Sequence, residues 1–308
     1  MISVIIPAFN EQENLDELYQ RLSDVALKVK GHDFEFIFVD DCSADDTQKM
    51  LKILNEKDKR VKAIRFARNS GSHAALAAGL NSCCGDCAIA LAADLQDPPE
   101  LISSLVEKWE KGAKTVWAAR SRRDGESFSV RIFSRIYYAL INALTNIQVS
   151  ALGADVFLID RKVIEALRKM PEKHSSIYMA IAWLGFTQET ICYVKEARHK
   201  GKSKWNLRMK VKLLLDSILS FSDIFIRLIS IFGFLMAFSG FVYALSIICR
   251  YFFFGIPGQG WSSLIVAIFV LGGIQMIMLG ILGEYVWRTF DESRNRPQYV
   301  VDYTIGLG

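Results

Sequence analysis

Acidic and amide side chains follow three stretches of the chain that are predicted to be β-strands. They are Asn10-Glu11, Asp40-Asp41, and Asp94 with Asp97. One acid in such a place is ordinary, because it can cap a helix or shape a loop. Three in the same register are better explained by ligand binding, since parallel α/β sheets bind ligands beyond the carboxyl ends of their strands. We therefore predict a nucleotide and a metal ion at this edge.

The clearest single motif runs from Ala92 to Glu100 and reads AADLQDPPE. An apolar strand ends at Asp94, a second oxygen ligand follows at Gln96, and two prolines begin the next helix. Hard cations such as Mg²⁺ and Mn²⁺ take oxygen ligands and usually share them with substrate phosphates. At positions i and i+2 of an extended strand end, Asp94 and Gln96 can face one ion together. We predict both as metal ligands, with Mg²⁺ or Mn²⁺ as the cofactor.

The elements that must position these residues follow from the hydrophobic pattern. The predicted strands span 2–6, 34–39, 61–66, 87–92, 114–119 and 189–194. Amphipathic helices are expected near 12–29, 44–56, 72–82 and 98–111. Such alternation predicts an α/β fold with a mainly parallel sheet covered on both faces. Neither a Walker A motif nor a G-x-G-x-x-G follows any of these strands; acids follow them instead.

The bulk composition excludes several classes of protein. With 308 residues, 51% hydrophobic and 23% charged, the chain is neither disordered nor a small disulfide scaffold. A net charge of +4 is too small to indicate a nucleic-acid partner. The six cysteines show no disulfide framework, and the C-x-x-C of Cys84 and Cys87 lacks the second ligand pair of a structural zinc site. Met1 leads straight into a strand without a signal peptide, so the first domain is expected to stay where it is made.

One long segment is nearly free of charge. From Leu228 to Gly283 the only charged residue is Arg250. Residues 228–249 and 261–283 are each long enough to cross a hydrocarbon core of about 30 Å. Basic residues precede the first span and follow the second, so the positive-inside rule places both termini in the cytoplasm and the short loop outside. We expect a multi-pass protein of the cytoplasmic membrane.

Two further stretches have the pattern of helices that lie in the headgroup plane. Residues 128–147 place aromatic and aliphatic side chains on one face, with Arg131 and Arg135 beside it; a core-facing helix is the alternative. Residues 205–227 begin basic and become apolar. The expected organisation is a sheet domain over 1–204, an amphipathic helix over 205–227, spans over 228–249 and 261–283, and a cytoplasmic tail over 284–308.

Together these motifs resemble the family 2 glycosyltransferases of the GT-A fold. The resemblance is greatest to the polyprenyl-phosphate branch, with its dolichyl-phosphate mannose synthases and two-span bactoprenol glucosyltransferases. It implies a Rossmann-like GT-A domain, interfacial helices and a transmembrane hairpin, and it covers essentially the whole chain. The matching pieces are Pro7–Glu11, Val39–Thr47, Arg68–Gly71, Asp94–Glu100, Arg120 with Arg123, Asp155 with Asp160-Arg161, Trp183–Phe186, Arg198 with Gly201–Trp205, and Gly283–Tyr285 with Arg296-Pro297.

The resemblance implies a role for each matching residue. The base and ribose of a nucleotide sugar would be held by Pro7, Glu11, Asp40 and Asp41, and the same motifs make Asn10 and Arg68 cofactor-binding residues. Asp94 and Gln96 would carry the metal that bridges the diphosphate. The phosphates of donor and acceptor would be surrounded by Arg120, Arg123, Arg198, Ser203 and Lys204. Arginine presents a planar fork of donors and lysine a point charge, and both stabilise the negative charge of a departing nucleoside diphosphate.

Asp155 matches the acid that the family places near the anomeric carbon of the sugar, and with Asp94 it is the predicted catalytic residue. It would act as a general base or would orient the acceptor phosphate. A phosphate monoester, with a second pKa of about 6, is already largely ionised at neutral pH and needs orientation more than deprotonation. The alternative for Asp155 is a structural acid at the start of a strand.

Three positions depart from the family pattern. Ala92 stands where the D-x-D motif begins with Asp, Phe157 stands where close relatives carry Arg, and Ser175 stands where a further Arg is expected. Since the predicted metal ligands and the arginines Arg120 and Arg123 are present, we still expect an active enzyme. The departures bear on which sugar it uses.

The resulting hypothesis is an inverting, metal-dependent transfer of one hexose, from UDP-glucose in the first place, to undecaprenyl phosphate. Interfacial helices and two spans suit an acceptor whose phosphate lies at headgroup level. One alternative is the same reaction with galactose, N-acetylglucosamine, mannose or an amino-arabinose. Another is a degenerate membrane-bound partner of a flippase or second transferase, which Ala92 and Phe157 would favour. A processive synthase is disfavoured, because its Q-x-x-R-W signature is absent.

Small residues in the spans allow close contacts between helices and hence a homo-oligomer. They are Gly233, Ala237, Gly280 and Gly283.

Overall fold

The computed structural model describes residues 1–122, 154–170, 176–194, 224–254 and 260–307. The chain divides into two units, Met1–Ser217 with Pro297–Gly308, and Ile218–Arg296. Several sequence predictions lie outside the described residues. These are the interfacial helix over 128–147, positions 205–223 of the juxtamembrane helix, and the single residues Arg123, Ser175, Arg198, Ser203 and Lys204.

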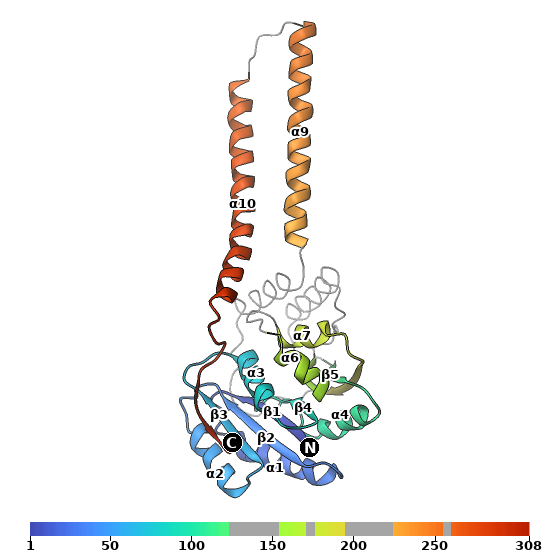
Figure 1. The fold of residues 1–308 in the computed structure, drawn as a ribbon, viewed down its shortest axis with the longest axis vertical. Coiled ribbons are helices and arrows are strands. Elements are labelled where there is room, and N and C mark those ends of the chain that lie inside the picture. The colour runs from blue at the N-terminus through green and yellow to red at the C-terminus, as the bar shows by residue number, and fades with distance from the viewer. Residues whose placement is uncertain (123–153, 171–175, 195–223, 255–259, 308) are drawn as a thin grey trace. The chain divides into compact units, whose positions relative to one another are not determined.

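The first unit is built on one sheet with helices on both faces (Figure 1). Its strands are β1 (Ile2–Ala8), β2 (Phe34–Asp40), β3 (Val61–Phe66), β4 (Cys87–Ala90), β5 (Thr115–Arg122), β6 (Ala154–Asp160), β7 (Gln188–Val194) and β8 (Val301–Ile305). The described helices of this unit are α1 (Leu15–Lys28), α2 (Thr47–Lys57), α3 (Ser72–Ser82), α4 (Leu101–Glu110), α6 (Arg161–Arg168) and α7 (Ile177–Trp183).

The sheet has the strand order β7-β5-β6-β4-β1-β2-β3-β8. Strand β1 is parallel to β2 and β4, β2 is parallel to β3, and β5 is parallel to β7. Strand β6 runs antiparallel to β4 and β5, and β8 antiparallel to β3. The predicted mainly parallel sheet is therefore confirmed. Because β4, β1, β2 and β3 are parallel neighbours, the loops that follow them gather at one edge.

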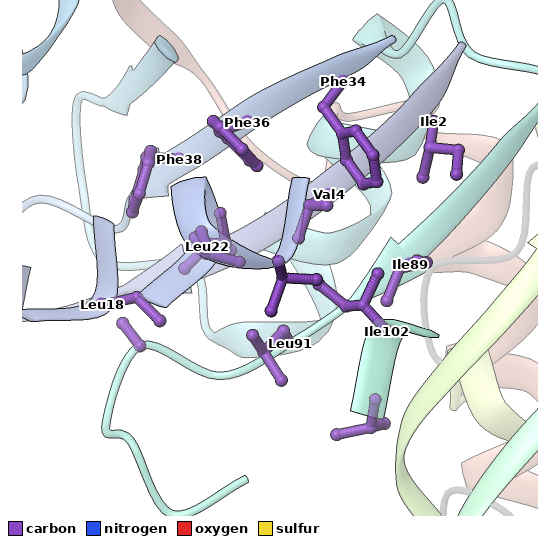
Figure 2. Packing of buried hydrophobic residues seen from close by; sticks show 14 of the residues in the cluster. Ile2, Val4, Leu18, Leu22, Phe34, Phe36, Phe38, Ile89, Leu91 and Ile102 are labelled. Atoms are coloured by element: carbon purple, nitrogen blue, oxygen red, sulfur yellow. The ribbon is translucent and has the colours of Figure 1, made fainter. Parts of the chain in front are cut away.

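Alternating residues of the central strands supply two cores, one on each face of the sheet. In β1, Ile2, Val4 and Ile6 belong to the cluster that includes side chains of α1, α2 and α4. Ile5 belongs to the cluster on the other face, with side chains of α3, α6 and α7. Figure 2 shows Leu18 and Leu22 of α1 packed over the first face. Burial on both faces explains why these strands read as nearly continuous apolar runs.

The structure adds two strands that the sequence pattern did not predict. Strand β6 lies between β4 and β5, and it begins next to Asp155. Strand β8 comes from the expected C-terminal tail and forms the edge beside β3. The strand expected over 87–92 is shorter, ending at Ala90, because the chain turns after Ala92.

The second unit contains two long helices, α9 (Ile224–Phe254) and α10 (Trp261–Ser293). Leu228–Ile247 and Val270–Ser293 are long and apolar enough to cross a membrane, with mean hydropathies of 2.1 and 1.5. Large apolar side chains such as Phe234, Phe252 and Met276 are exposed on them. The helices meet at Gly233, where a Cβ would lie 3.5 Å from the Met278 Cε atom.

Candidate active site

The loops after β1 and β2 are joined to each other by hydrogen bonds. The Asn10 backbone N–H donates to Ser43 Oγ (2.9 Å), and the Ala44 N–H donates to Asn10 Oδ1 (2.8 Å). The Glu11 N–H donates to Thr47 Oγ1 at 3.0 Å. Asn10 and Glu11, two predicted cofactor-binding residues, therefore belong to one double loop at the carboxyl edge of the sheet.

Three residues other than glycine have a left-handed backbone at this edge. They are Asn10 (φ 56°), Cys42 (φ 61°) and Leu95 (φ 56°), which follow β1, β2 and β4. This conformation costs most L-residues on the order of 1 kcal/mol, and such strain clusters at functional sites. The left-handed residues were not predicted from the sequence, because of the three only Asn10 is a residue type that commonly adopts this backbone conformation. The strain marks the same edge that the acids mark.

Asp40 ends β2 and shapes the loop from inside the protein. Its carboxylate accepts hydrogen bonds from the Ser43 N–H (2.9 Å) and from Arg65 Nη1 (2.5 Å), and the residue is only 1% exposed. Pro7 lies half-buried on β1, one residue before Ala8, the register partner of Asp40. Asp40 therefore holds internal groups, and its contact with a nucleotide stays a prediction.

Asp41 draws the segment after β3 to the same place. It accepts hydrogen bonds from the N–H groups of Ser70 (2.6 Å) and Gly71 (2.9 Å). The pKa of the Asp41 carboxyl is raised above its ordinary value, mainly because the group is buried and also because Asp40 is a neighbouring negative charge. The two N–H groups lower the pKa, but by less. The bonded segment also carries Arg68, which is exposed. The structure thus brings together the motif at Asp41 and the motif at Ser70 and Gly71, which lie 29 and 30 residues further along the chain.

The predicted metal ligands Asp94 and Gln96 lie in a turn rather than at an extended strand end. The left-handed Leu95 separates them, and the Gln96 N–H donates to Asp94 Oδ1 at 3.2 Å. The expectation of an extended end is therefore wrong, and its physical reason is the turn that Leu95 makes. Both side chains are half-buried.

The donor set of this turn still suits a hard cation. Among the residues that the structure describes, no three His, Cys, Asp or Glu side chains are gathered as a metal site. Asp94 and Gln96 would supply two oxygen ligands. Mg²⁺ and Mn²⁺ sites of this kind commonly use one or two carboxylates and complete the coordination with water and substrate phosphates. The residues present therefore fit the group.

The ends of β5 and β6 bring Arg120 and Asp155 together as an ion pair. Asp155 is half-buried, and its backbone carbonyl accepts a hydrogen bond from the Tyr178 hydroxyl of α7 at 3.2 Å. The register of β5 shifts against both of its neighbours, after Ala118 on one side and after Arg120 on the other. Such irregularities occur next to active sites because they redirect side chains. Arg120, predicted as a phosphate ligand, and Asp155, predicted as a catalytic residue, are thus in contact.

A residue that sequence reasoning missed joins this pair to the predicted metal loop. Tyr193 of β7 donates a hydrogen bond from its hydroxyl to Asp97 Oδ1, at 2.5 Å. Arg120 donates a hydrogen bond to the same tyrosine. Tyr193 was read only as part of an apolar strand, and its partner Asp97 lies 96 residues away, so no local signal could have found it.

Phe157, one of the three departures from the family pattern, is a core residue here. Its side chain is fully buried, and its ring packs against Trp117 and Tyr178, with centroids 5.8 and 5.5 Å apart. The position is filled by aromatic packing rather than left open. Ala92, the second departure, is half-buried in the loop before Asp94.

Comparisons with known proteins agree with this fold. The family model described as "Glycosyl transferase family 2" matches residues 3–168. The uncharacterized glycosyltransferase YkcC of Bacillus subtilis is 36% identical over 305 residues, covering 99% of this chain and 94% of the relative. The bactoprenol glucosyl transferase of Shigella phage SfV is 35% identical over 300 residues and covers 97% of each chain.

Solved structures show a similar fold at low identity. Glucosyl-3-phosphoglycerate synthase of Mycobacterium tuberculosis, in complex with Mn²⁺, UDP-glucose and phosphoglyceric acid, is 19% identical with a TM-score of 0.51. The match covers 70% of this chain and 79% of that chain. It places the sheet domain among structures of the same general architecture.

Proposed function

Since the chain belongs to glycosyl transferase family 2 and is a glycosyltransferase, we propose that it transfers a single hexose from a UDP-sugar to a polyprenyl phosphate. UDP-glucose is the proposed donor and undecaprenyl phosphate the proposed acceptor. The observation that carries this proposal is that relatives named bactoprenol glucosyl transferases align with 97% of this chain. The aligned length includes both the site edge and the apolar helices.

The double loop after β1 and β2 supports a donor site. Asn10, Glu11 and Arg68 lie half-buried or exposed on loops that Asp40 and Asp41 hold from inside. A preorganised loop needs little rearrangement when a ligand binds, which lowers the cost of binding. In this proposal the nucleoside rests on these loops, at the carboxyl edge of β1, β2 and β3.

The proposed reaction forms one bond and breaks one. An oxygen of the acceptor phosphate bonds to C1 of the hexose, while the bond from C1 to the nucleoside diphosphate breaks and its electron pair leaves with the diphosphate. Attack from the face opposite the leaving group inverts the configuration at C1. Arg120 would stabilise the phosphate charge that develops, since a guanidinium already in place acts most strongly in the transition state. Asp155 holds Arg120 and would orient the acceptor phosphate.

Asp94 and Gln96 are the proposed ligands of Mg²⁺ or Mn²⁺. When bound, the cation would neutralise charge on the leaving diphosphate. The structural contribution of the chain is the turn at Leu95, which sets the spacing of the two ligands.

A lipid acceptor supplies the reason for the apolar helices. A polyprenyl phosphate keeps its tail in the hydrocarbon and its phosphate among the headgroups, so an enzyme that uses it must work at the membrane surface. We propose that α9 and α10 anchor the chain in the cytoplasmic membrane, with the sheet domain on the cytoplasmic side. The exposed apolar surfaces of both helices support this location.

The test uses purified full-length protein in detergent with undecaprenyl phosphate, Mn²⁺ or Mg²⁺, and radiolabelled UDP- and GDP-sugars. We expect label from one donor, UDP-glucose, to enter the organic phase. Asp94→Ala and metal removal by EDTA should each lower transfer at least about 100-fold, since each removes charge stabilisation from the transition state. Asp24→Ala, on the exposed face of α1, should leave transfer unchanged.

Three outcomes would count against the proposal. No lipid-linked label from any donor, with folded protein and an active reference enzyme, would favour the degenerate-partner alternative. Metal-dependent hydrolysis of the nucleotide sugar without transfer would contradict the proposed acceptor. Full activity of Asp94→Ala would remove Asp94 from the metal site.

A further inference from the structure

Tyr193 lies at the centre of a chain of polar contacts that crosses four elements. Its hydroxyl donates to Asp97 Oδ1 at 2.5 Å and accepts from Arg120, which is paired with Asp155. Tyr193 is on β7, Arg120 on β5, Asp155 on β6, and Asp97 in the loop that carries Asp94 and Gln96. The chain therefore connects the predicted metal loop with the predicted catalytic pair.

The directions of these hydrogen bonds support one another. Asp97 is 1% exposed, and its carboxylate accepts the phenolic proton. A phenol that donates to a carboxylate becomes a better acceptor, so it holds the Arg120 guanidinium more firmly. Burial first, and then the charge of Asp97, raise the pKa of Tyr193, so the hydroxyl keeps its proton and remains a donor throughout the neutral range.

Backbone geometry places the tyrosine beside the arginine. Arg120 and Tyr193 are register partners in the parallel pair of β5 and β7, and the register shifts directly after them. Arg120 is therefore held from two sides, by Tyr193 on β7 and by Asp155 on β6. A long arginine side chain gains a defined direction only from such contacts, because its free rotamers are many.

We propose that Tyr193 is a positioning residue for sugar transfer, which aims Arg120 toward the reacting phosphates and couples that aim to the metal loop through Asp97. This inference rests on the proposed function and adds to it a residue that touches neither substrate. Its consequence is specific. Loss of the hydroxyl should slow the chemical step far more than it weakens donor binding, because it disturbs the contacts of Arg120 and Asp97 and leaves the predicted nucleotide-binding loops unchanged.

The test compares Tyr193→Phe with Tyr19→Phe in the full-length enzyme. Tyr19 is a matched control, since its hydroxyl also donates to a carboxylate, that of Asp58 at 3.0 Å, away from the site. We expect Tyr193→Phe to lower kcat about 10- to 100-fold, with KM for the nucleotide sugar changed less than about threefold. Tyr19→Phe should keep kcat within about twofold of wild type, and its change in thermal midpoint measures the loss of one such hydrogen bond away from the site.

A second variant tests the coupling, and its own effect on kcat can be measured even if Tyr193→Phe does not fold. Asp97→Asn keeps the volume of the side chain and an acceptor for the tyrosine, but removes the charge. We expect it to lower kcat, and we expect its effect to shrink in the Tyr193→Phe background, because the two residues act through one contact. If the fold-change in kcat of the double variant equalled the product of the two single fold-changes, the residues would act independently and the coupling would be wrong.

The outcomes separate this inference from the proposed function. If wild-type protein transfers no sugar, the proposed function fails. If wild-type protein transfers sugar and Tyr193→Phe matches Tyr19→Phe in kcat, the positioning role is wrong and the hydroxyl is structural. A rise in KM with unchanged kcat would also overturn the inference, because it would place Tyr193 in substrate binding.

Discussion

Four acidic side chains at the strand ends form two pairs that differ in burial. Asp40 and Asp41 accept hydrogen bonds from neighbouring loops and from Arg65, and both are buried. Asp94 and Asp155 are only half-buried. A buried carboxylate is stable only when its oxygens are bonded, so the first pair builds the loops, and the second pair is the more accessible to a ligand.

A further buried acid provides a pH-dependent prediction. Glu35 of β2 accepts hydrogen bonds from Lys62, Ser3 and the Cys84 N–H at 2.5–2.7 Å. Burial raises the pKa of Glu35, but these three partners lower it by more, so its net pKa lies below the ordinary value. A pKa lowered on folding gives stability that is present above the unfolded value, about 4.3, and that is lost as the pH falls through the folded value.

We therefore expect Glu35→Gln to destabilise the protein by about 1–3 kcal/mol at pH 7. The difference from wild type should shrink as the pH is lowered from about 5 toward 2, since the wild-type carboxyl is then protonated as well. Thermal midpoints in detergent over a pH series measure this. A difference that stays constant over the whole range would mean that the ionised form of Glu35 contributes nothing.

At the scale of elements, the sheet depends on a strand that arrives from the far end of the sequence. Strand β8 pairs with β3, and the segment before it adds Tyr299, which stacks on Phe66 with ring centroids 4.9 Å apart. Asn81 of α3 donates a hydrogen bond to the Tyr299 hydroxyl at 3.1 Å. The C-terminal segment therefore covers the edge of β3, an edge that would otherwise expose unpaired backbone groups.

Gly306, just after β8, offers a test of this closure. It has φ +69°, and a Cβ there would lie 2.7 Å from Asn55 Nδ2, which donates to the Val61 carbonyl at 2.6 Å. We expect Gly306→Ala to cost about 2–3 kcal/mol, from backbone strain together with displacement of Asn55. Gly31→Ala is the control, because Gly31 has φ +89° with nothing within 4 Å of its Cβ, and should cost only about 1 kcal/mol. Equal thermal midpoints for the two variants would mean that the segment after β8 can shift away from Asn55 without loss of stability.

At the scale of the whole molecule, the chain combines a sheet domain with a pair of apolar helices. Exposed phenylalanine and methionine side chains on α9 and α10 are unfavourable in water and favourable in lipid. The basic residues that flank the spans set the orientation in our proposal. Under the proposed function, the sheet domain would bind the phosphate of the lipid acceptor, and the apolar helices would lie beside its tail.

Cysteine labelling in intact spheroplasts measures the orientation. In a Cys249→Ala background, we expect Gln259→Cys to react with a membrane-impermeant maleimide without permeabilisation, because the loop between the spans is predicted to lie outside. Cys84, exposed on the sheet domain, is the internal control and should react only after permeabilisation. Reaction of Cys84 in intact spheroplasts would reverse the proposed topology.

Local pattern alone was enough to predict the mainly parallel sheet, the edge that carries the acids, and the two apolar helices. Hydrophobic period and composition act over a few residues, and parallel strands necessarily bring their following loops to one edge. The motifs were also sufficient to predict the family, which the comparisons confirm.

The other features depend on contacts between segments that are distant in the sequence. The pairing of β8 with β3, the burial of Phe157 and the contact of Tyr193 with Asp97 each join residues far apart in the chain. The turn at Leu95, which replaced the expected extended end, depends on a left-handed backbone that leucine does not itself favour. Such features arise from packing of the whole fold, since a local sequence preference of about 1 kcal/mol is readily overridden by burial and long-range hydrogen bonds.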